Sequence, residues 1–241
     1  MSDVKVNQSD TEKLVRDKIS ELLSFREEDQ DLKEFWGKQF DLGLAWVQFP
    51  EGAGGLGVNP KYQLLVIEEL RKAGISQQNR IANILGIGMG APTIVEFGTK
   101  EQVDRYLRPM FIADEIWCQL FSEPGSGSDL ASLSTRAVDD GDSYILNGQK
   151  VWTTLGHLAK WGLVVTRTDP EVPKHRGLTF FIVDMEGDGV EVRPLRQITG
   201  EAEFNEIYFT DARVPKENLL GEVGDGWRVS LTILMNERVA I

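Results

Sequence analysis

Apolar side chains in the first half of the chain recur at the spacing of one helix face. A segment that Asp10 or Thr11 caps contains Leu14, Val15, Ile19, Leu22 and Leu23. Residues 62–72 repeat the pattern before Gly74, and residues 101–112 repeat it again. The spacing predicts an all-helical N-terminal part.

Beyond residue 115 the apolar period shortens toward two. Residues 163–166, 178–184, 190–192 and 206–209 are expected to be strands, separated by turns of Gly, Pro and Asp. Asn147-Gly148, between the apolar arms of residues 143–154, predicts a hairpin. Short strands at this spacing indicate a middle antiparallel β-barrel or sandwich domain.

From Gly226 the pattern is helical again, and it reaches residue 241 without a capping residue or a glycine. An amphipathic helix of this kind needs something to pack against. We therefore expect the chain to be the front part of a longer protein, or to need a partner chain. The predicted class is α+β, with domains at 1–115, 116–222 and 223–241.

The amino-acid composition limits the kinds of partner and site that the protein can have. The net charge of −12 argues against nucleic acid and anionic membranes. The single cysteine, Cys118, excludes an internal disulfide and is expected to be a buried small hydrophobe. Two histidines without a CxxC spacing predict no metal site. The sequence shows neither a secretory signal nor an apolar run of about 18 residues, so we expect a soluble, cytoplasmic protein without a membrane span.

The candidate chemistry lies in two segments. An apolar run breaks at Ser122 into a loop of Gly, Ser and Pro, whose amide and hydroxyl groups suit a pyrophosphate. Residues 150–154 supply an indole and two hydroxyls, which suit a flat heteroaromatic ring. The loop has neither the Walker nor the Rossmann pattern. A surface turn with Ser128 or Asp129 as a helix cap is the alternative, whereas the two segments together indicate a flavin dinucleotide site.

The motifs LFSEPGSGSD (120–129) and LNGQKVWTT (146–154) closely resemble the acyl-CoA dehydrogenase family. The likeness also includes FPEGAGGLG (49–57), FGTKEQ (97–102), DARVP (211–215) and the Gly226-Trp227 pair. It implies that a helical N-terminal domain, a β-domain and a C-terminal four-helix bundle enclose FAD. Only the truncated start of that bundle would be present here.

The resemblance also implies site residues. Those implied to bind the cofactor are Gln119, Phe121, Ser122, Gly127, Ser128, Trp152, Thr153 and Thr154. Ser128 is also implied to contact the CoA chain, and Thr154 to bond near flavin N5. For Trp152, packing in the core is an alternative that is compatible with this role.

The family places its catalytic carboxylate either far into the C-terminal bundle or on the first long helix of that bundle. Glu237 matches the second placement and Arg238 matches an arginine near the substrate. Alternatively, Glu237 is a solvated helix glutamate and Arg238 is a surface or interface cation. Where relatives often have an acidic residue, this chain has Met235.

Three glycines in residues 83–92 predict a close approach or a broken helix. The resemblance puts this segment along the acyl pocket, where Gly86 and Gly90 would leave room for a bulky acyl group. Tight helix packing is the alternative.

The resemblance thus implies an FAD-dependent acyl-CoA dehydrogenase. Such an enzyme produces a trans-2-enoyl-CoA, passes electrons to an electron-transferring flavoprotein, and assembles as a homo- or heterotetramer. A related flavin oxidase, of the acyl-CoA oxidase or nitroalkane oxidase type, and a non-catalytic partner subunit are the alternatives. The sequence does not specify the length, branching or ring content of the acyl group.

Overall fold

A computed structural model describes residues 8–240, apart from the side chains of Val239 and Ala240. The chain divides into two compact units. The first comprises the described residues up to Ala82 together with Val103–Asp114. The second comprises Asn83–Gln102 and the described residues from Glu115 onward. Each unit is described by itself below.

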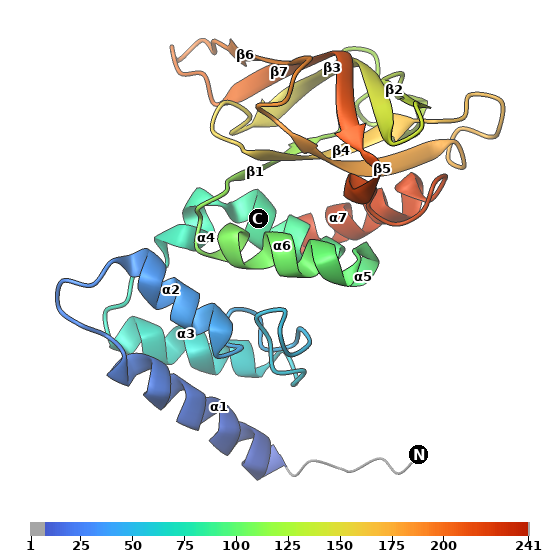
Figure 1. Cartoon of the computed structure of the whole chain (residues 1–241). Helices are drawn as coiled ribbons and strands as arrows, with labels where there is room; N and C mark the ends of the chain where they lie inside the picture. The colour runs from blue at the N-terminus through green and yellow to red at the C-terminus, as the bar shows by residue number, and fades with distance from the viewer. Residues whose placement is uncertain (1–7, 241) are drawn as a thin grey trace, which may run out of the picture. The chain divides into compact units, whose positions relative to one another are not determined.

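The first unit is helical, as the apolar spacing predicts (Figure 1). Its helices are α1 (Gln8–Ser24), α2 (Leu32–Asp41), α3 (Tyr62–Lys72), α4 (Gln78–Ala82) and most of α6 (Lys100–Phe111). α1 buries Val15, Ile19 and Leu22, which share one helix face. α3 has the predicted bounds, and Gly74 follows it with a φ of 70°, a left-handed conformation that glycine adopts without strain.

An aromatic cluster fills the core of this unit. The Phe40 ring lies 6.3 Å from the Trp46 ring and 6.2 Å from the Phe111 ring, measured between centroids. Phe40 belongs to α2, which begins after Asp31, whose side chain accepts a hydrogen bond from Lys33 N at 2.9 Å. The spacing argument missed α2 because the helix is short and its inner face is aromatic.

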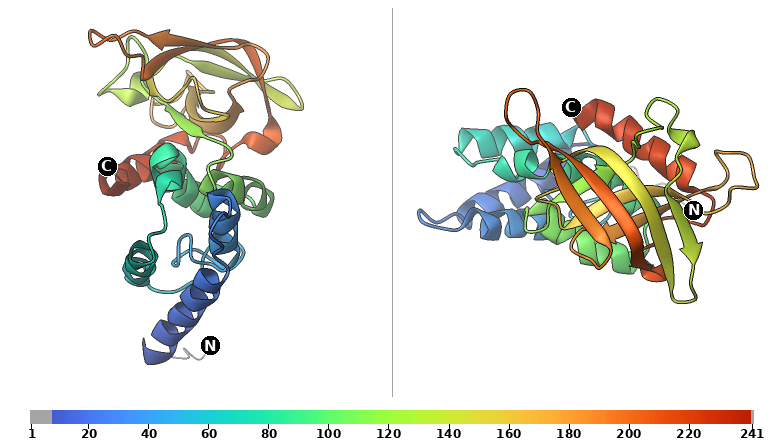
Figure 2. Two further views of the ribbon diagram at one scale, coloured as in Figure 1. Left: turned by 90° about the vertical axis from the view of Figure 1, so that its left-hand side faces the viewer. Right: turned by 90° about the horizontal axis from the view of Figure 1, so that it is seen from above.

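The second unit is built on one curled, seven-stranded sheet. Its strands are β1 (Trp117–Leu120), β2 (Arg136–Asp139), β3 (Ser143–Thr154), β4 (Trp161–Arg167), β5 (Leu178–Asp184), β6 (Val190–Leu195) and β7 (Phe204–Pro215). The hydrogen-bonded order is β1-β4-β2-β3-β7-β6, and β5 pairs with β4. The long strands β3 and β7 run side by side, as two further views show (Figure 2).

The predicted α+β class is confirmed, with a helical N-terminal part, a curled sheet and one C-terminal helix. The sheet is mixed, because β4 runs parallel to β1 and, at one position, to β2. Strands β1 and β4 are far apart in sequence, and a pairing of that kind leaves no trace in local periodicity.

The predicted hairpin at Asn147-Gly148 is wrong. β3 continues through both residues, and its pairing with β7 shifts between Leu146 and Gly148. Asn147 Nδ2 donates to Asp211 Oδ1 at 3.0 Å, and Asp211 N donates to Asn147 Oδ1 at 3.1 Å. The pair therefore marks a β-bulge, which uses the same permissive backbone as a turn but leaves the strand uninterrupted.

The glycine-rich segment after Asn83 forms an irregular helix, as predicted. Gly86–Gly90 is a π-helix, η1, that leads into α5 (Ala91–Phe97). The final helix, α7 (Gly226–Ala240), packs against η1, α5 and β5. The glycines thus lie at a helix–helix contact. Among the described residues, no helix is long and apolar enough to cross a bilayer.

Gly148 provides a test of the bulge. A Cβ there would lie 2.4 Å from Thr135 Oγ1 and 2.7 Å from Thr135 Cα, at a φ of 153°. We expect Gly148→Ala to lower the free energy of unfolding by about 1–3 kcal/mol, measured by urea denaturation. Gly125→Ala is the control, because no atom lies within 4 Å of its Cβ position, and it should change stability little. Equal effects of the two substitutions would contradict the bulge geometry.

Candidate functional site

A tight polar turn follows β1. Glu123 N donates to Ser126 O at 2.8 Å and Ser126 N donates to Glu123 O at 3.0 Å, which closes a two-residue turn at Pro124-Gly125. Proline and glycine are typical of such turns. In the described part of the chain, no hydrogen bond uses the backbone N–H of Gly127 or Ser128. These two amides are therefore available to a ligand.

A second bulge in β3 turns Trp152 outward. Lys150 pairs with Ile207 and Thr153 pairs with Asn205, so two residues of β3 oppose one residue of β7. Trp152 has a φ of 62°, and its side chain is 64% exposed. A left-handed backbone costs a bulky residue about 1–3 kcal/mol, and such strain concentrates at functional sites. An indole this exposed is not a core residue.

A buried ion pair joins the turn to this strand. Lys150 Nζ lies 2.9 Å from Glu123 Oε1 and also donates to Phe121 O at 3.1 Å. The other carboxylate oxygen, Glu123 Oε2, accepts hydrogen bonds from the backbone N–H and the hydroxyl of Ser134, both at 2.7 Å. The side chain of Lys150 is 0% exposed and that of Glu123 is 4% exposed, so the pair is sealed from solvent.

Burial and the partner's charge shift the pKa of each member of this pair in opposite directions. Burial acts to raise the pKa of Glu123, but the Lys150 charge and the hydrogen bonds from Thr135 and Ser134 outweigh it and lower that pKa to about 2. Burial lowers the pKa of Lys150 to about 8, against the opposing charge of Glu123. Both groups are therefore charged at neutral pH.

The polar turn, the bulge and α7 line one pocket of about 370 Å³, within the usual range for ligand sites. Its lining residues are Gln119, Phe121, Ser122, Gly127, Ser128, Leu130, Val151, Trp152, Trp227, Leu234 and Glu237. Trp227, Leu234 and Glu237 share one face of α7, because they are seven and three residues apart. The pocket therefore has an aromatic wall, amide and hydroxyl donors, and one carboxylate.

Most of the residues implied by the resemblance meet in this pocket, but three do not line it. Thr153 is buried, and its Oγ1 has no hydrogen-bond partner among the described residues. Thr154 is half-buried, and Arg238, one position beyond Glu237 on α7, is exposed.

The sequence argument missed other lining residues. Leu234 belongs to the predicted helix, and Trp227 belongs to that helix and to the Gly226-Trp227 pair of the resemblance. Neither was predicted as a site residue, although their spacing from Glu237 places all three on one helix face. Leu130 and Val151 carry no such signal, since each is an ordinary apolar residue. Neither Gly86 nor Gly90 lines the pocket; instead, their segment packs against α7.

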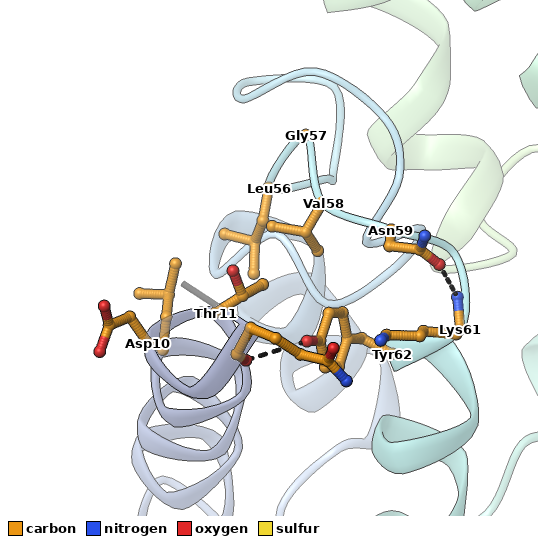
Figure 3. Close-up of a pocket in the computed structure, with 10 residues that line it drawn as sticks. Asp10, Thr11, Leu56, Gly57, Val58, Asn59, Lys61 and Tyr62 are labelled. Atoms are coloured by element: carbon orange, nitrogen blue, oxygen red, sulfur yellow. Dashed lines mark hydrogen bonds between the residues drawn. The ribbon is translucent and has the colours of Figure 1, made fainter. Parts of the chain in front are cut away.

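The first unit has a separate hollow of about 650 Å³, between α1 and the segment of residues 56–62 (Figure 3). Tyr62 Oη donates to Gln8 O at 3.1 Å, and Lys61 N donates to Asn59 Oδ1 at 3.0 Å. The first bond joins the segment to α1, and the second fixes the turn within the segment. None of the site residues implied by the sequence lies there.

The described residues contain no group of three His, Cys, Asp or Glu side chains arranged to hold a metal ion. Cys118 is fully buried, as predicted, and burial raises the pKa of its thiol well above the usual range. A thiol of this kind is a poor nucleophile at neutral pH.

Comparison with known proteins identifies the family. Residues 5–113 match the domain described as "Acyl-CoA dehydrogenase, N-terminal domain", and residues 118–212 match "Acyl-CoA dehydrogenase, middle domain". The chain belongs to the acyl-CoA dehydrogenase family. Its resemblance to that family, first drawn from the two motifs, is confirmed.

Named members are similar over most of this chain. Acyl-CoA dehydrogenase FadE34 of Mycobacterium tuberculosis is 48% identical over 83% of the chain and 28% of its own length. The human short-chain specific mitochondrial acyl-CoA dehydrogenase is 34% identical over 85% of the chain and 49% of its own length. The chain thus spans about half or less of these relatives.

Two solved structures share the fold. The Geobacillus kaustophilus acyl-CoA dehydrogenase has a TM-score of 0.69 at 30% identity, with 99% of this chain and 65% of that chain covered. The ChsE4-ChsE5 complex from Mycobacterium tuberculosis has a TM-score of 0.67 at 30% identity, with 98% and 61% covered.

The buried pair predicts a large effect of Glu123→Gln in this family member. Lys150 would remain buried without a countercharge, so we expect the free energy of unfolding to fall by about 3–5 kcal/mol in urea denaturation. Asp139→Asn is the control, because Asp139 pairs with Lys216 at 2.9 Å where both side chains are about half exposed. Its effect should be much smaller. Comparable losses of unfolding free energy in the two variants would contradict the conclusion that burial makes the Glu123–Lys150 pair more important for stability than an exposed pair.

The pKa of Glu123 also predicts a pH dependence. It is about 2 in the folded protein against a reference value of 4.5, so the unfolded chain binds more protons between these values. The stabilisation by Glu123 is complete above pH 4.5 and is lost as the pH falls through about 2. We expect the difference in unfolding free energy between the wild type and Glu123→Gln to shrink by about 3 kcal/mol across this window. A difference independent of pH would contradict the ionised pair.

Proposed function

We propose that this chain is the FAD-binding and substrate-binding part of an acyl-CoA dehydrogenase, which oxidises an acyl-CoA thioester to a trans-2-enoyl-CoA. The observation that carries the proposal is the single pocket in which the polar turn, the exposed indole of Trp152 and the carboxylate of Glu237 meet. Family membership supports the reaction class.

The residues of the pocket fit a flavin dinucleotide. The amide N–H groups of Gly127 and Ser128 have no partner in the described chain and would bind phosphate oxygens. Trp152 offers an aromatic edge or face. Thr153 and Thr154 follow it in β3 outside the pocket lining, and the family resemblance is the reason to propose that they add hydroxyls beside the ring system. The buried Thr153 Oγ1, which lacks a partner among the described residues, fits such a contact. Gln119, Phe121 and Ser122 would approach the ring from the strand end.

FAD held by these residues would supply the acceptor for the hydride from the β-carbon of the thioester. The chain itself would supply the base for the α-proton. Glu237 lies in the pocket on α7 beside the apolar Trp227 and Leu234. A carboxylate placed beside the substrate is the type of group that can take the α-proton. Ser128 and Arg238 would bind the CoA part of the thioester.

The domain organisation is part of the proposal. Residues 1–115 would form the helical domain, 116–222 the flavin-carrying β-domain, and 223–241 the first helix of a C-terminal bundle. A tetramer in the cytoplasm and electron transfer to an electron-transferring flavoprotein would follow from the family. One similar structure comes from work on the electron-transferring flavoprotein of Acidaminococcus fermentans, and another is the ChsE4-ChsE5 complex, which supports the proposal of such partners.

A flavin oxidase and a non-catalytic subunit are the two alternatives, and flavin reduction by an acyl-CoA followed by reoxidation in air distinguishes them from a dehydrogenase. A flavin oxidase would be reduced by an acyl-CoA and then reoxidised rapidly in air, whereas a dehydrogenase would stay reduced for much longer. A non-catalytic subunit would bind FAD, but its yellow colour would not bleach with any acyl-CoA. Anaerobic bleaching followed by slow reoxidation supports the proposed function, and a protein that purifies without flavin and refuses added FAD contradicts it.

Glu237→Gln tests the base. Loss of the carboxylate should slow anaerobic flavin reduction by acyl-CoA about 10²- to 10⁴-fold, measured by stopped-flow absorbance, with FAD binding retained. Glu222→Gln is the control, since Glu222 is exposed before α7 and lies outside the pocket. If Glu237→Gln reduces its flavin at the wild-type rate, the base is another residue.

A further inference from the structure

Trp152 holds a backbone conformation that its own side chain disfavours, so neighbouring groups must maintain it. On its N-terminal side, Val151 N donates to Ser122 O at 2.9 Å. Lys150, one residue earlier, is anchored by Glu123 and by Phe121 O. The strand is therefore fixed up to the bulge.

On the C-terminal side, one side chain fixes the strand. Asn205 is fully buried in β7, opposite Thr153, and its Nδ2 donates to Thr153 O at 2.9 Å. The same nitrogen lies 3.2 Å from His157 Nδ1 and 3.4 Å from Glu203 O. Asn205 thus ties the first residue after the bulge to β7 and to the segment that follows β3.

The register of β3 against β7 explains why the hydrogen bond from Asn205 to Thr153 is needed. Thr153 and Asn205 are the first pair after the shift, so the ladder resumes there after two residues of β3 have faced one of β7. A ladder that resumed one residue earlier in β3, with Trp152 opposite Asn205, would remove the extra residue. Trp152 would then alternate inward, on the same side as the buried Lys150.

We propose that Asn205 is a positioning residue, which holds the bulge in β3 and thereby sets the orientation of Trp152 in the pocket. The inference rests on the proposed function only for its consequence, namely that the indole so oriented contacts the flavin. The orientation itself is a property of this chain and is testable without cofactor.

Asn79 provides a matched control. It is also a buried asparagine, its Nδ2 donates to a backbone carbonyl, Phe111 O, at 2.8 Å, and its Oδ1, like that of Asn205, has no partner among the described residues. It belongs to the first unit and does not line the pocket. Asn79→Ser and Asn205→Ser therefore each remove a buried amide bond to a backbone carbonyl, at different places, and Asn205→Ser also removes the contacts with His157 Nδ1 and Glu203 O.

The experiment labels the protein with 5-fluorotryptophan and assigns the Trp152 fluorine resonance through Trp152→Phe. We expect a decrease in Tm for both serine variants, but a shifted Trp152 resonance only in Asn205→Ser. In the FAD-bound protein, Asn205→Ser should also shift the flavin absorption bands and weaken FAD binding about tenfold, the size of one hydrogen bond. Asn79→Ser should leave both unchanged.

A Trp152 resonance that stays at its wild-type position in Asn205→Ser, or one that moves equally in Asn79→Ser, overturns the proposal. If Asn205→Ser does not fold, Asn205→Thr, which suits a strand and also lacks the amide, is measured in the same way. Failure of the wild-type protein to bind FAD contradicts the proposed function, whereas the fluorine resonances still decide whether Asn205 positions Trp152.

Discussion

The side chains of Glu123 and Lys150 meet inside the second unit, 2.9 Å apart and almost without exposure to solvent. Glu123 belongs to the polar turn after β1, and Lys150 lies two residues before the exposed indole of Trp152. Their contact therefore determines how the two segments that line the pocket are placed relative to each other. A buried charge is tolerated only with an opposite charge and hydrogen bonds. The backbone N–H groups of Ser134 and Thr135 donate to the Glu123 carboxylate, and the Phe121 carbonyl accepts from Lys150.

Two bulges between β3 and β7 complete this arrangement. An extra residue in β7, near Asp211, shifts the register, and the extra residue in β3, near Trp152, restores it. Between the two shifts β3 keeps its ladder, with Lys150 buried, whereas beyond Lys150 the inward–outward alternation is broken at Trp152. The second bulge thus turns the indole toward the pocket without disturbing either end of the strand pair.

Helix α7 supplies the remaining wall of the pocket. Its packing on the glycine-rich η1 and on β5 presents Trp227, Leu234 and Glu237 to the turn and the bulge. An aromatic wall, open amides and a carboxylate are the groups that a flavin and an acidic carbon would require. These groups and the family membership of the chain are the two supports of the proposed function.

The sequence by itself determined the helical first part, the strand-rich middle, the final helix and the family, because periodicity and ordered motifs are local properties of a chain. It also identified most of the pocket residues through resemblance, although Thr153, Thr154 and Arg238 do not line the pocket. Only the tertiary structure decided that Asn147-Gly148 is a bulge, that β1 pairs with β4, and that Glu123 meets Lys150. Each of these depends on a partner that is distant in sequence, and the energy of a buried pair or a paired strand exists only once that partner is in place.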